Sequence, residues 1–244
     1  TIFHRPEEGF TLQIGDGQEI ANATGIMTIN DFRSEDVSKG GQGAPLVPIG
    51  DRHLFAEFPI CLNIGGIANV SYEMNGRRIA YDICMANQLL NYLANKLGYD
   101  YDNNGQFAKQ GKVDKELFDI LNDNAYYKQD APKSLGREFF ENVQHKIIDE
   151  SSLSINDLLA TATEHIAHQI VKSTDNLEKS KMLVTGGGAK NNFLIERICS
   201  LSKHEIVIPD VMITDFKEAL IFAFLGVLKM EGKINVLSSV TGAS

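Results

Sequence analysis

The sequence predicts an α/β fold in which a mixed sheet is flanked by helices. Two glycine turns, at Gly65-Gly66 and at 186–188, each follow a largely apolar run, as when a strand enters a tight turn. Over roughly 59–232 the strand and helix patterns follow the order β-β-β-α and later β-α-β-α. The 244 residues, 43% of them hydrophobic, are enough to bury a large core.

The elements expected before residue 59 are short. Phe10, Leu12 and Ile14 alternate with polar residues, which is typical of a strand in a hairpin. The glycine-rich loop 40–45 leads into an apolar stretch whose pattern stops at Asp51-Arg52-His53. The expected elements are a hairpin at 1–15, a helix at 17–24, a strand at 26–32 and the apolar stretch at 46–49.

Longer elements follow residue 58. Turns are predicted at Gly65-Gly66 and at Asn75-Gly76, the second of which is a strong type I′ hairpin signal. The helix at 154–178 carries apolar residues on one face, namely Leu158, Leu159, Ala162, Ile166, Ile170 and Val171. The expected elements are three strands within 59–82, helices at 86–97, 114–123, 135–150, 154–178, 191–202 and 215–230, and strands at 181–185 and 205–208.

Composition and charge exclude several function classes. The net charge of −9, without a basic cluster, argues against a nucleic-acid partner. No apolar stretch approaches the roughly 20 residues of a membrane span, and the first residues lack a signal-peptide pattern, so a cytoplasmic protein without a membrane segment is predicted. Cys61, Cys84 and Cys199 match no zinc spacing and are expected to be reduced thiols in the core.

The two glycine turns indicate a phosphate or nucleotide site. Backbone amides of glycine can approach a phosphate closely because no Cβ stands in the way. Neither turn has the GxxxxGK[ST] or the GxGxxG pattern. We therefore expect an ATP site that is assembled from turns far apart in the sequence.

Ten sequence blocks, in order along the whole chain, resemble the anhydro-N-acetylmuramic acid kinase family. The blocks GGQGAPLVP (40–48) and NIGGIANVS (63–71) are the most specific; the others are HRP (4–6), TLQIGD (11–16), DFR (31–33), YDICMANQLLN (81–91), PKSLGRE (132–138), VTGGGAKNN (184–192), KEALIFAFLG (217–226) and SVTGA (239–243). The resemblance implies an actin-like ATPase (ribonuclease H-like) fold. It also implies a cytoplasmic bacterial enzyme of cell-wall recycling that uses ATP, Mg²⁺ and water to convert 1,6-anhydro-N-acetylmuramic acid into N-acetylmuramic acid 6-phosphate.

The resemblance places the catalytic aspartate at Asp82, followed by Asn87 as a substrate-binding residue. A carboxylate at a strand end suits a base that deprotonates the attacking water. The alternative is that Asp82 caps the helix expected to begin near Ala86. Many family members have Thr-Gly-Pro after this aspartate, whereas this chain has Ile83-Cys84-Met85, which affects how the carboxylate is aimed.

The other substrate-binding residues implied by the resemblance are Arg33, Glu218 and His4. A guanidinium at Arg33 can bind the carboxylate of a muramic acid through two hydrogen bonds. The alternatives are a surface ion pair of Arg33 with Asp31 or Glu35, a carboxylate of Glu218 in the first turn of a helix, and a structural role for His4.

The nucleotide-binding residues implied by the resemblance lie in the two glycine turns. They are Asn63, Gly65 and Gly66 for phosphate, and Gly186, Gly187, Gly188 and Asn191 for adenosine. The alternatives are a plain Gly-Gly hairpin and a tight turn between strand and helix. No metal-ligating residue is predicted, and Lys133 and Arg137 match the family block without an assigned role.

The resemblance also divides the chain. Residues 1–58 are expected to be the tail of a first lobe, forming part of the sugar cleft, and residues 59–244 a second lobe. No glycine-rich hairpin with Ser or Thr and Asp precedes Asp82, so an upstream segment that also carries the carboxylate nearest Mg²⁺ is expected to be missing. Such a chain is expected to have little activity alone and to form a homodimer. The alternatives are a non-catalytic sugar- or nucleotide-binding remnant, and another sugar or acetate kinase.

Overall fold

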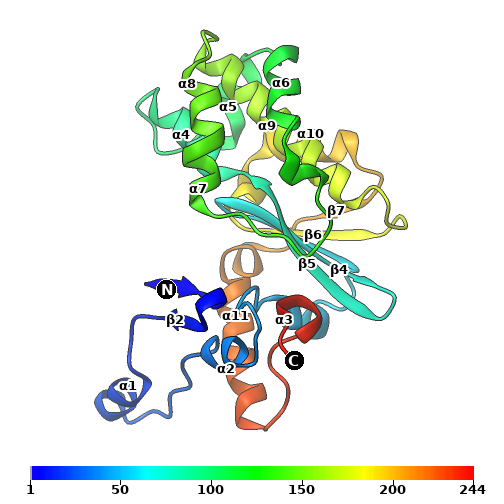
Figure 1. Cartoon of the computed structure of the whole chain (residues 1–244). Helices are drawn as coiled ribbons and strands as arrows, with labels where there is room; N and C mark the ends of the chain where they lie inside the picture. The colour runs from blue at the N-terminus through cyan, green and yellow to red at the C-terminus, as the bar shows by residue number, and fades with distance from the viewer. Residues whose placement is uncertain (1) are drawn as a thin grey trace. The chain divides into compact units, whose positions relative to one another are not determined.

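The computed structural model describes residues 2–244, apart from the side chain of Arg137, and it divides into two compact units (Figure 1). The first unit contains Thr1–Ala56, Glu73–Ala80 and Phe216–Ser244. The second contains Glu57–Tyr72 and Tyr81–Asp215. The sequence predicted a boundary between residues 58 and 59. In the structure one boundary falls close to it, after Ala56, and the C-terminal segment Phe216–Ser244 belongs to the first unit. That residues 1–58 are the tail of a separate lobe stays a prediction.

A five-stranded mixed sheet, in the order β5-β4-β3-β6-β7, forms the core of the second unit (Figure 1). Strand β3 pairs antiparallel with β4 and parallel with β6, and β6 pairs parallel with β7. Because β3 and β6 have neighbours on both sides and are mostly buried, their sequences are largely apolar. The strands are β3 (Ile60–Ile64), β4 (Ile67–Met74), β5 (Arg77–Met85), β6 (Lys181–Thr185) and β7 (Glu205–Val207). The predicted α/β class is confirmed.

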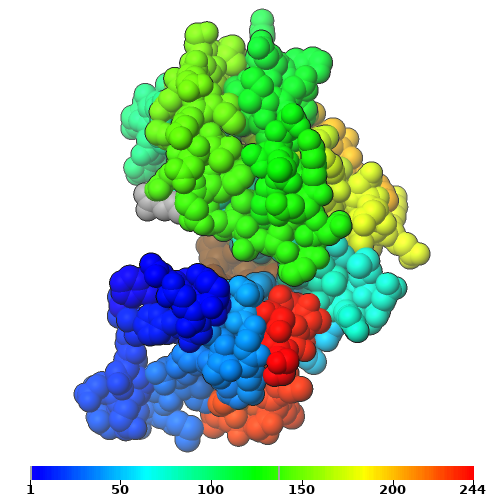
Figure 2. Space-filling view, viewed as in Figure 1, coloured from blue at the N-terminus to red at the C-terminus, as the bar shows by residue number. Residues whose placement is uncertain are grey.

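Helices cover this sheet, and α9 (Ile155–Thr174) is the central one. It packs against α4, α5, α6 and α10, and five of the six apolar residues predicted for its buried face are buried. The segment from α5 to α8, green in the space-filling view, forms a continuous surface of this unit (Figure 2). The remaining elements are α4 (Asn87–Asn95), η2 (Asn103–Gly105), α5 (Gln106–Gln110), α6 (Lys115–Asn122), η3 (Ala125–Lys128), α7 (Arg137–Phe139), the π-helical η4 (Phe140–Gln144), α8 (His145–Asp149), η5 (Gly187–Lys190) and α10 (Asn192–Leu201).

The first unit is built from short elements and most of α11. The predicted hairpin forms between β1 and β2, with Phe3 opposite Leu12, and Asp16 caps α1 through two backbone N–H groups. The elements are β1 (Phe3–Arg5), η1 (Pro6–Glu8), β2 (Phe10–Leu12), α1 (Gly17–Thr24), α2 (Ser34–Ser38), α3 (Pro48–Leu54), α11 (Val211–Met230) and α12 (Ser238–Thr241).

Three local predictions are wrong. The strand expected at 26–32 is absent from this described segment, because Asp31 has a φ of 54° and accepts hydrogen bonds from Ser34 that lead into α2. The break expected at 51–53 lies inside α3, which Pro48 begins because its φ suits the first helical turn. Cys199 is exposed, whereas Cys61 and Cys84 are buried as expected.

No helix in the described part of the chain is both long and apolar enough to cross a bilayer.

Candidate functional site

Asp82 lies near the end of β5, and hydrogen bonds from a single neighbouring segment hold it. The carboxylate oxygen Oδ2 accepts a hydrogen bond of 2.9 Å from the backbone N–H of Leu135. The backbone N–H of Asp82 donates to the carbonyl of Lys133 at 3.3 Å, and the hydroxyl of Tyr126 donates to the carbonyl of Asp82 at 2.5 Å. Both the backbone and the side chain of Asp82 are therefore held in place.

Burial raises the pKa of Asp82 above its ordinary value, and the hydrogen bond from Leu135 opposes that rise by stabilising the charged form. A carboxylate with a raised pKa is a stronger base once it is ionised. The residue thus combines a fixed orientation with the electrostatic environment of a general base.

Asp82 is not a helix cap. Helix α4 has Ala86 at its N-cap without a side-chain hydrogen bond, so the capping alternative is wrong. Ile83, Cys84 and Met85 extend β5 and are buried. Three apolar side chains in the core thus continue the strand beyond Asp82.

The two glycine turns meet at one edge of the sheet. The parallel pairing of Asn63 with Thr185 places the ends of β3 and β6 side by side. The backbone N–H groups of Ala86 and Asn87 donate to the carbonyls of Gly66 and Gly65, at 2.8 and 3.0 Å, which brings the end of β5 to the same edge. Open α/β sheets bind ligands beyond the carboxyl ends of their strands.

Two of the glycines are required by packing. A Cβ on Gly186, whose φ is +86°, would lie 2.6 Å from Oδ1 of Asn63 and 2.8 Å from the carbonyl oxygen of Ile64. A Cβ on Gly188 would lie 2.2 Å from Cγ2 of Ile64. At these two positions the need for a tight turn is enough to explain the glycine, and no bound ligand is required.

The other three glycines have no such requirement. A Cβ on Gly65 would approach no described atom closer than 3.5 Å, one on Gly66 none closer than 3.9 Å, and one on Gly187 only Nδ2 of Asn87 at 3.4 Å. None of the three has a positive φ that would demand glycine. Their uncovered backbone fits a site at which a ligand approaches the main chain.

A cavity of about 450 Å³ opens beside this edge, within the size range of ligand pockets. It contains three of the predicted residues, Asn87, Gly187 and Asn191. The rest of its lining is Leu90, Asn91, Tyr101, Asp102, Asn103, Asn104 and Lys190. Sequence reasoning missed these residues because most of them come from 90–104, a segment without a nucleotide motif.

The three predicted asparagines also have structural roles. The amide Nδ2 of Asn87 donates to the carbonyl of Ile64 at 3.1 Å, which ties α4 to the end of β3. Asn191 caps α10 by accepting from the backbone N–H of Leu194 at 3.1 Å. The side chain of Asn63 lies against the turn at Gly186. These contacts explain how the edge is held in shape.

In the first unit, His4 and Arg33 gather around Gly43. Nη1 of Arg33 donates to the carbonyl of Gly43 at 2.5 Å. A Cβ on Gly43 would meet Cε1 of His4 and Cβ of Arg33, each at 3.4 Å. Burial lowers the pKa of Arg33, and the negative charge of Glu218 opposes this by favouring the charged guanidinium. Arg33 and Glu218 thus interact electrostatically, and His4 lies beside Arg33 at Gly43.

The alternative for Arg33 is wrong. The alternative for Glu218, an exposed carboxylate at the start of a helix, is right about its exposure and wrong about its place in the helix. Asp31 accepts from Ser34, and Glu35 pairs with Lys39 and Lys229, so Arg33 is not in the expected ion pair. Helix α11 begins at Val211, which places Glu218 two turns from the helix start. The helix dipole acts mainly on the first turn, so it does not explain a carboxylate at this position. His4 does have a structural contact, between Nδ1 and the hydroxyl of Thr11 at 3.1 Å.

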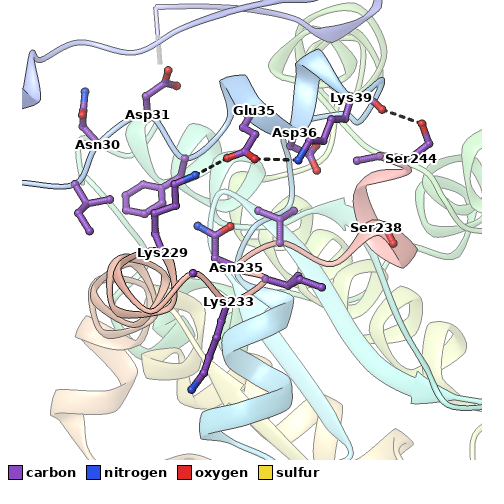
Figure 3. Close-up of a pocket in the computed structure, with 16 residues that line it drawn as sticks. Asn30, Asp31, Glu35, Asp36, Lys39, Lys229, Lys233, Asn235, Ser238 and Ser244 are labelled. Carbon is purple, nitrogen blue, oxygen red and sulfur yellow. Dashed lines mark hydrogen bonds and ion pairs between the residues drawn. The ribbon is translucent and has the colours of Figure 1, made fainter.

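A second cavity, of about 740 Å³, lies in the first unit beside α2 (Figure 3). Glu35 joins Lys229 and Lys39 on its wall, and the hydroxyl of Ser244 donates to the carbonyl of Lys39 (Figure 3). The described lining does not include His4, Arg33 or Glu218. This cavity is therefore separate from the predicted substrate residues.

Within the residues that the structure describes, no group of three or more His, Cys, Asp or Glu side chains could hold a metal ion.

The mixed α/β sheet, with glycine turns at its strand ends, a cavity beside them and a held carboxylate on β5, has the architecture expected of the actin-like ATPase fold. The comparisons with known proteins specify the family. The model of the anhydro-N-acetylmuramic acid kinase family matches residues 1–244. The chain belongs to this family, and the identification made from its ten sequence blocks is confirmed.

Curated relatives with this name include one from Vibrio cholerae, 39% identical over all of this chain and 70% of the relative. One from Methylorubrum populi is 36% identical over all of this chain and 66% of the relative. The chain thus spans about two thirds of their length. Among solved structures, the activator of the 2-hydroxyisocaproyl-CoA dehydratase from Clostridium difficile with bound ADPNP is 19% identical, with a TM-score of 0.44 over 73% of this chain and 64% of that chain.

Proposed function

We propose that this chain is an ATP-dependent kinase that converts 1,6-anhydro-N-acetylmuramic acid into N-acetylmuramic acid 6-phosphate. Membership of the family supports the kinase activity and the amino-sugar substrate. The observation that carries the site assignment is the carboxylate of Asp82, half-buried and held by the N–H of Leu135 at 2.9 Å.

Asp82 is the general base in this proposal. Its carboxylate removes a proton from a water molecule as the water oxygen bonds to the anomeric carbon. The bond between that carbon and the bridging oxygen breaks, and the bridging oxygen forms a bond to the γ-phosphorus of ATP, from which ADP leaves. Because phosphoryl transfer depends chiefly on positioning and charge neutralisation, the fixed direction of the carboxylate matters as much as its basicity.

The sugar is recognised by Arg33, Glu218, His4 and Asn87. Arg33 binds the lactyl carboxylate, because a guanidinium forms charge-assisted hydrogen bonds with carboxylates. Its bond to the carbonyl of Gly43 fixes the direction from which it does so. Glu218 stabilises the positive charge of Arg33 and accepts hydrogen bonds from sugar hydroxyls.

ATP binds at the glycine edge of the second unit. Gly65, Gly66 and Gly187 expose backbone toward open space, and the cavity of about 450 Å³ beside Gly187 and Asn191 accommodates the nucleoside. Asn63, Gly186 and Gly188 shape the turns. We expect Mg²⁺ to accompany ATP and to neutralise phosphate charge, although the described residues contain no cluster that would retain it in the protein.

We expect the protein to work in the cytoplasm as a homodimer, without a nucleic-acid partner. The net charge of −9 supports the last expectation.

The test is the Asp82→Asn variant of the full-length protein, assayed by mass spectrometry for sugar 6-phosphate formed from ATP. An amide preserves the shape of the side chain but cannot accept the proton, so turnover should fall by about 10²- to 10⁴-fold while both substrates still bind. Asp175→Asn, the same substitution at an exposed position, is the control and should leave turnover unchanged. Near-normal turnover by Asp82→Asn would remove Asp82 as the base.

A further inference from the structure

We propose that Lys133 is a positioning residue, which fixes the direction of the Asp82 carboxylate by closing the segment 126–135 around it. We call this segment the Asp82 clasp. The inference rests on the proposed function, because it assigns Lys133 a role in the reaction through Asp82.

Three groups of the clasp hold Asp82. The hydroxyl of Tyr126 donates to its carbonyl at 2.5 Å, the carbonyl of Lys133 accepts from its N–H at 3.3 Å, and the N–H of Leu135 donates to Oδ2 at 2.9 Å. The two ends of the clasp therefore bond to the same residue. The carboxylate keeps its direction only if these ends keep their spacing.

The side chain of Lys133 sets that spacing. Its ammonium group donates to the carbonyl of Tyr126 at 3.2 Å and to the carbonyl of Gln129 at 2.9 Å. Both acceptors are main-chain atoms at the beginning of the clasp, whereas Lys133 is at its end. The ammonium group thus joins the two halves of the clasp, and few other residue types could donate to two carbonyls over this distance.

The same ammonium group lies over two aromatic rings beside Asp82. It is 4.8 Å from the ring centre of Tyr126 and 5.3 Å from that of Tyr81, the residue before Asp82. Cation–π contacts of this kind contribute most when the cation is partly desolvated. Lys133 is half-buried, and burial lowers its pKa. Its position is therefore fixed by the protein rather than by solvent.

No described contact joins the ammonium group of Lys133 to the carboxylate of Asp82. The carboxylate hydrogen bond comes from the N–H of Leu135, two residues further on. Loss of the ammonium group should thus act by releasing the clasp and moving the carboxylate. A displacement of about 1 Å can lower a rate by about 10²-fold.

The test compares Lys133→Met and Lys133→Arg with the wild type. Lys133→Met should lower kcat by roughly 10- to 100-fold and leave KM for the sugar and for ATP unchanged, since neither substrate contacts Lys133 in the proposed site. Lys133→Arg, which can still donate to both carbonyls, should recover most of kcat. Lys179→Met is the control, because Lys179 is exposed and its side chain makes no hydrogen bond or ion pair within the described residues.

A readout without turnover makes the test independent of the base assignment. Hydrogen exchange of the Leu135 amide should be faster in Lys133→Met than in the wild type and Lys179→Met, and slow again in Lys133→Arg. Unchanged kcat with unchanged Leu135 exchange would overturn the positioning role. An active Asp82→Asn variant would overturn the proposed function, whereas the exchange result would still decide whether Lys133 closes the clasp.

Discussion

Two adjacent glycines, Gly186 and Gly187, should respond in opposite ways to the same substitution. Gly186 has a φ of +86°, a conformation that disfavours a side chain by roughly 1–2 kcal/mol. Its new Cβ would also lie 2.6 Å from Oδ1 of Asn63 and 2.8 Å from the backbone oxygen of Ile64. Overpacking of this kind typically costs roughly 1–3 kcal/mol. Gly186→Ala should therefore lower the free energy of unfolding by about 2–5 kcal/mol.

Gly187→Ala should leave stability almost unchanged. Its Cβ would meet only Nδ2 of Asn87, a flexible side chain, at 3.4 Å, and its φ is not in the left-handed region. We expect a change in the free energy of unfolding within about 0.5 kcal/mol. The methyl group would instead project into the proposed nucleotide cavity and weaken binding of a non-hydrolysable ATP analogue by roughly tenfold, or about 1.4 kcal/mol.

Urea unfolding followed by circular dichroism measures the stability of both variants, and calorimetry measures binding of the analogue. Each variant is the other's control, since both add one methyl group to the same turn. Wild-type stability in Gly186→Ala would refute the packing argument. Full affinity in Gly187→Ala would show that the nucleotide does not approach this backbone.

Three further predictions concern charge. Arg33→Ala should reduce the preference for the natural sugar over an analogue without the lactyl carboxylate, from roughly tenfold toward none, by calorimetry. An unchanged preference would exclude Arg33 from carboxylate binding. Burial lowers the pKa of His165 to about 3. As the pH falls below about 6.5, this histidine gains a proton in the unfolded state but not in the folded state. The folded state should therefore lose about 2 kcal/mol of stability by pH 5 through this group. His165→Gln should lessen that loss and the exposed His53→Gln should not, as urea unfolding at pH 7 and pH 5 would show; equal losses in both would contradict the argument. The carboxylate of the buried Asp51 lies 2.7 Å from the ammonium group of Lys217 and 3.8 Å from the guanidinium of Arg78. Lys217→Met removes the nearer cation and should destabilise the protein by about 3 kcal/mol in urea unfolding. Wild-type stability would show that the more distant Arg78 is sufficient for Asp51.

The sequence predicted those elements whose signals are local. The runs at β3 and β6, the hairpin turn at Asn75-Gly76 and the apolar face of α9 depend on periodicity and turn chemistry within a few residues. The strand expected at 26–32 failed because hydrogen bonds from Ser34 to Asp31 favour a turn over an extended chain. The start of α11 was placed four residues late, since Asp210 caps it by accepting from the N–H groups of Met212 and Ile213.

The amino-acid sequence by itself determined the fold class, the family and the candidate carboxylate, because these follow from local patterns and from motif blocks along the chain. Only the tertiary structure decided what surrounds each candidate. It separated Gly186, which packing against β3 requires, from Gly187, which borders a cavity. It also showed that Leu135, more than fifty residues away in sequence, holds the carboxylate of Asp82. Such contacts depend on how segments far apart in sequence pack together, and no pattern within a short stretch of sequence encodes which segments will meet.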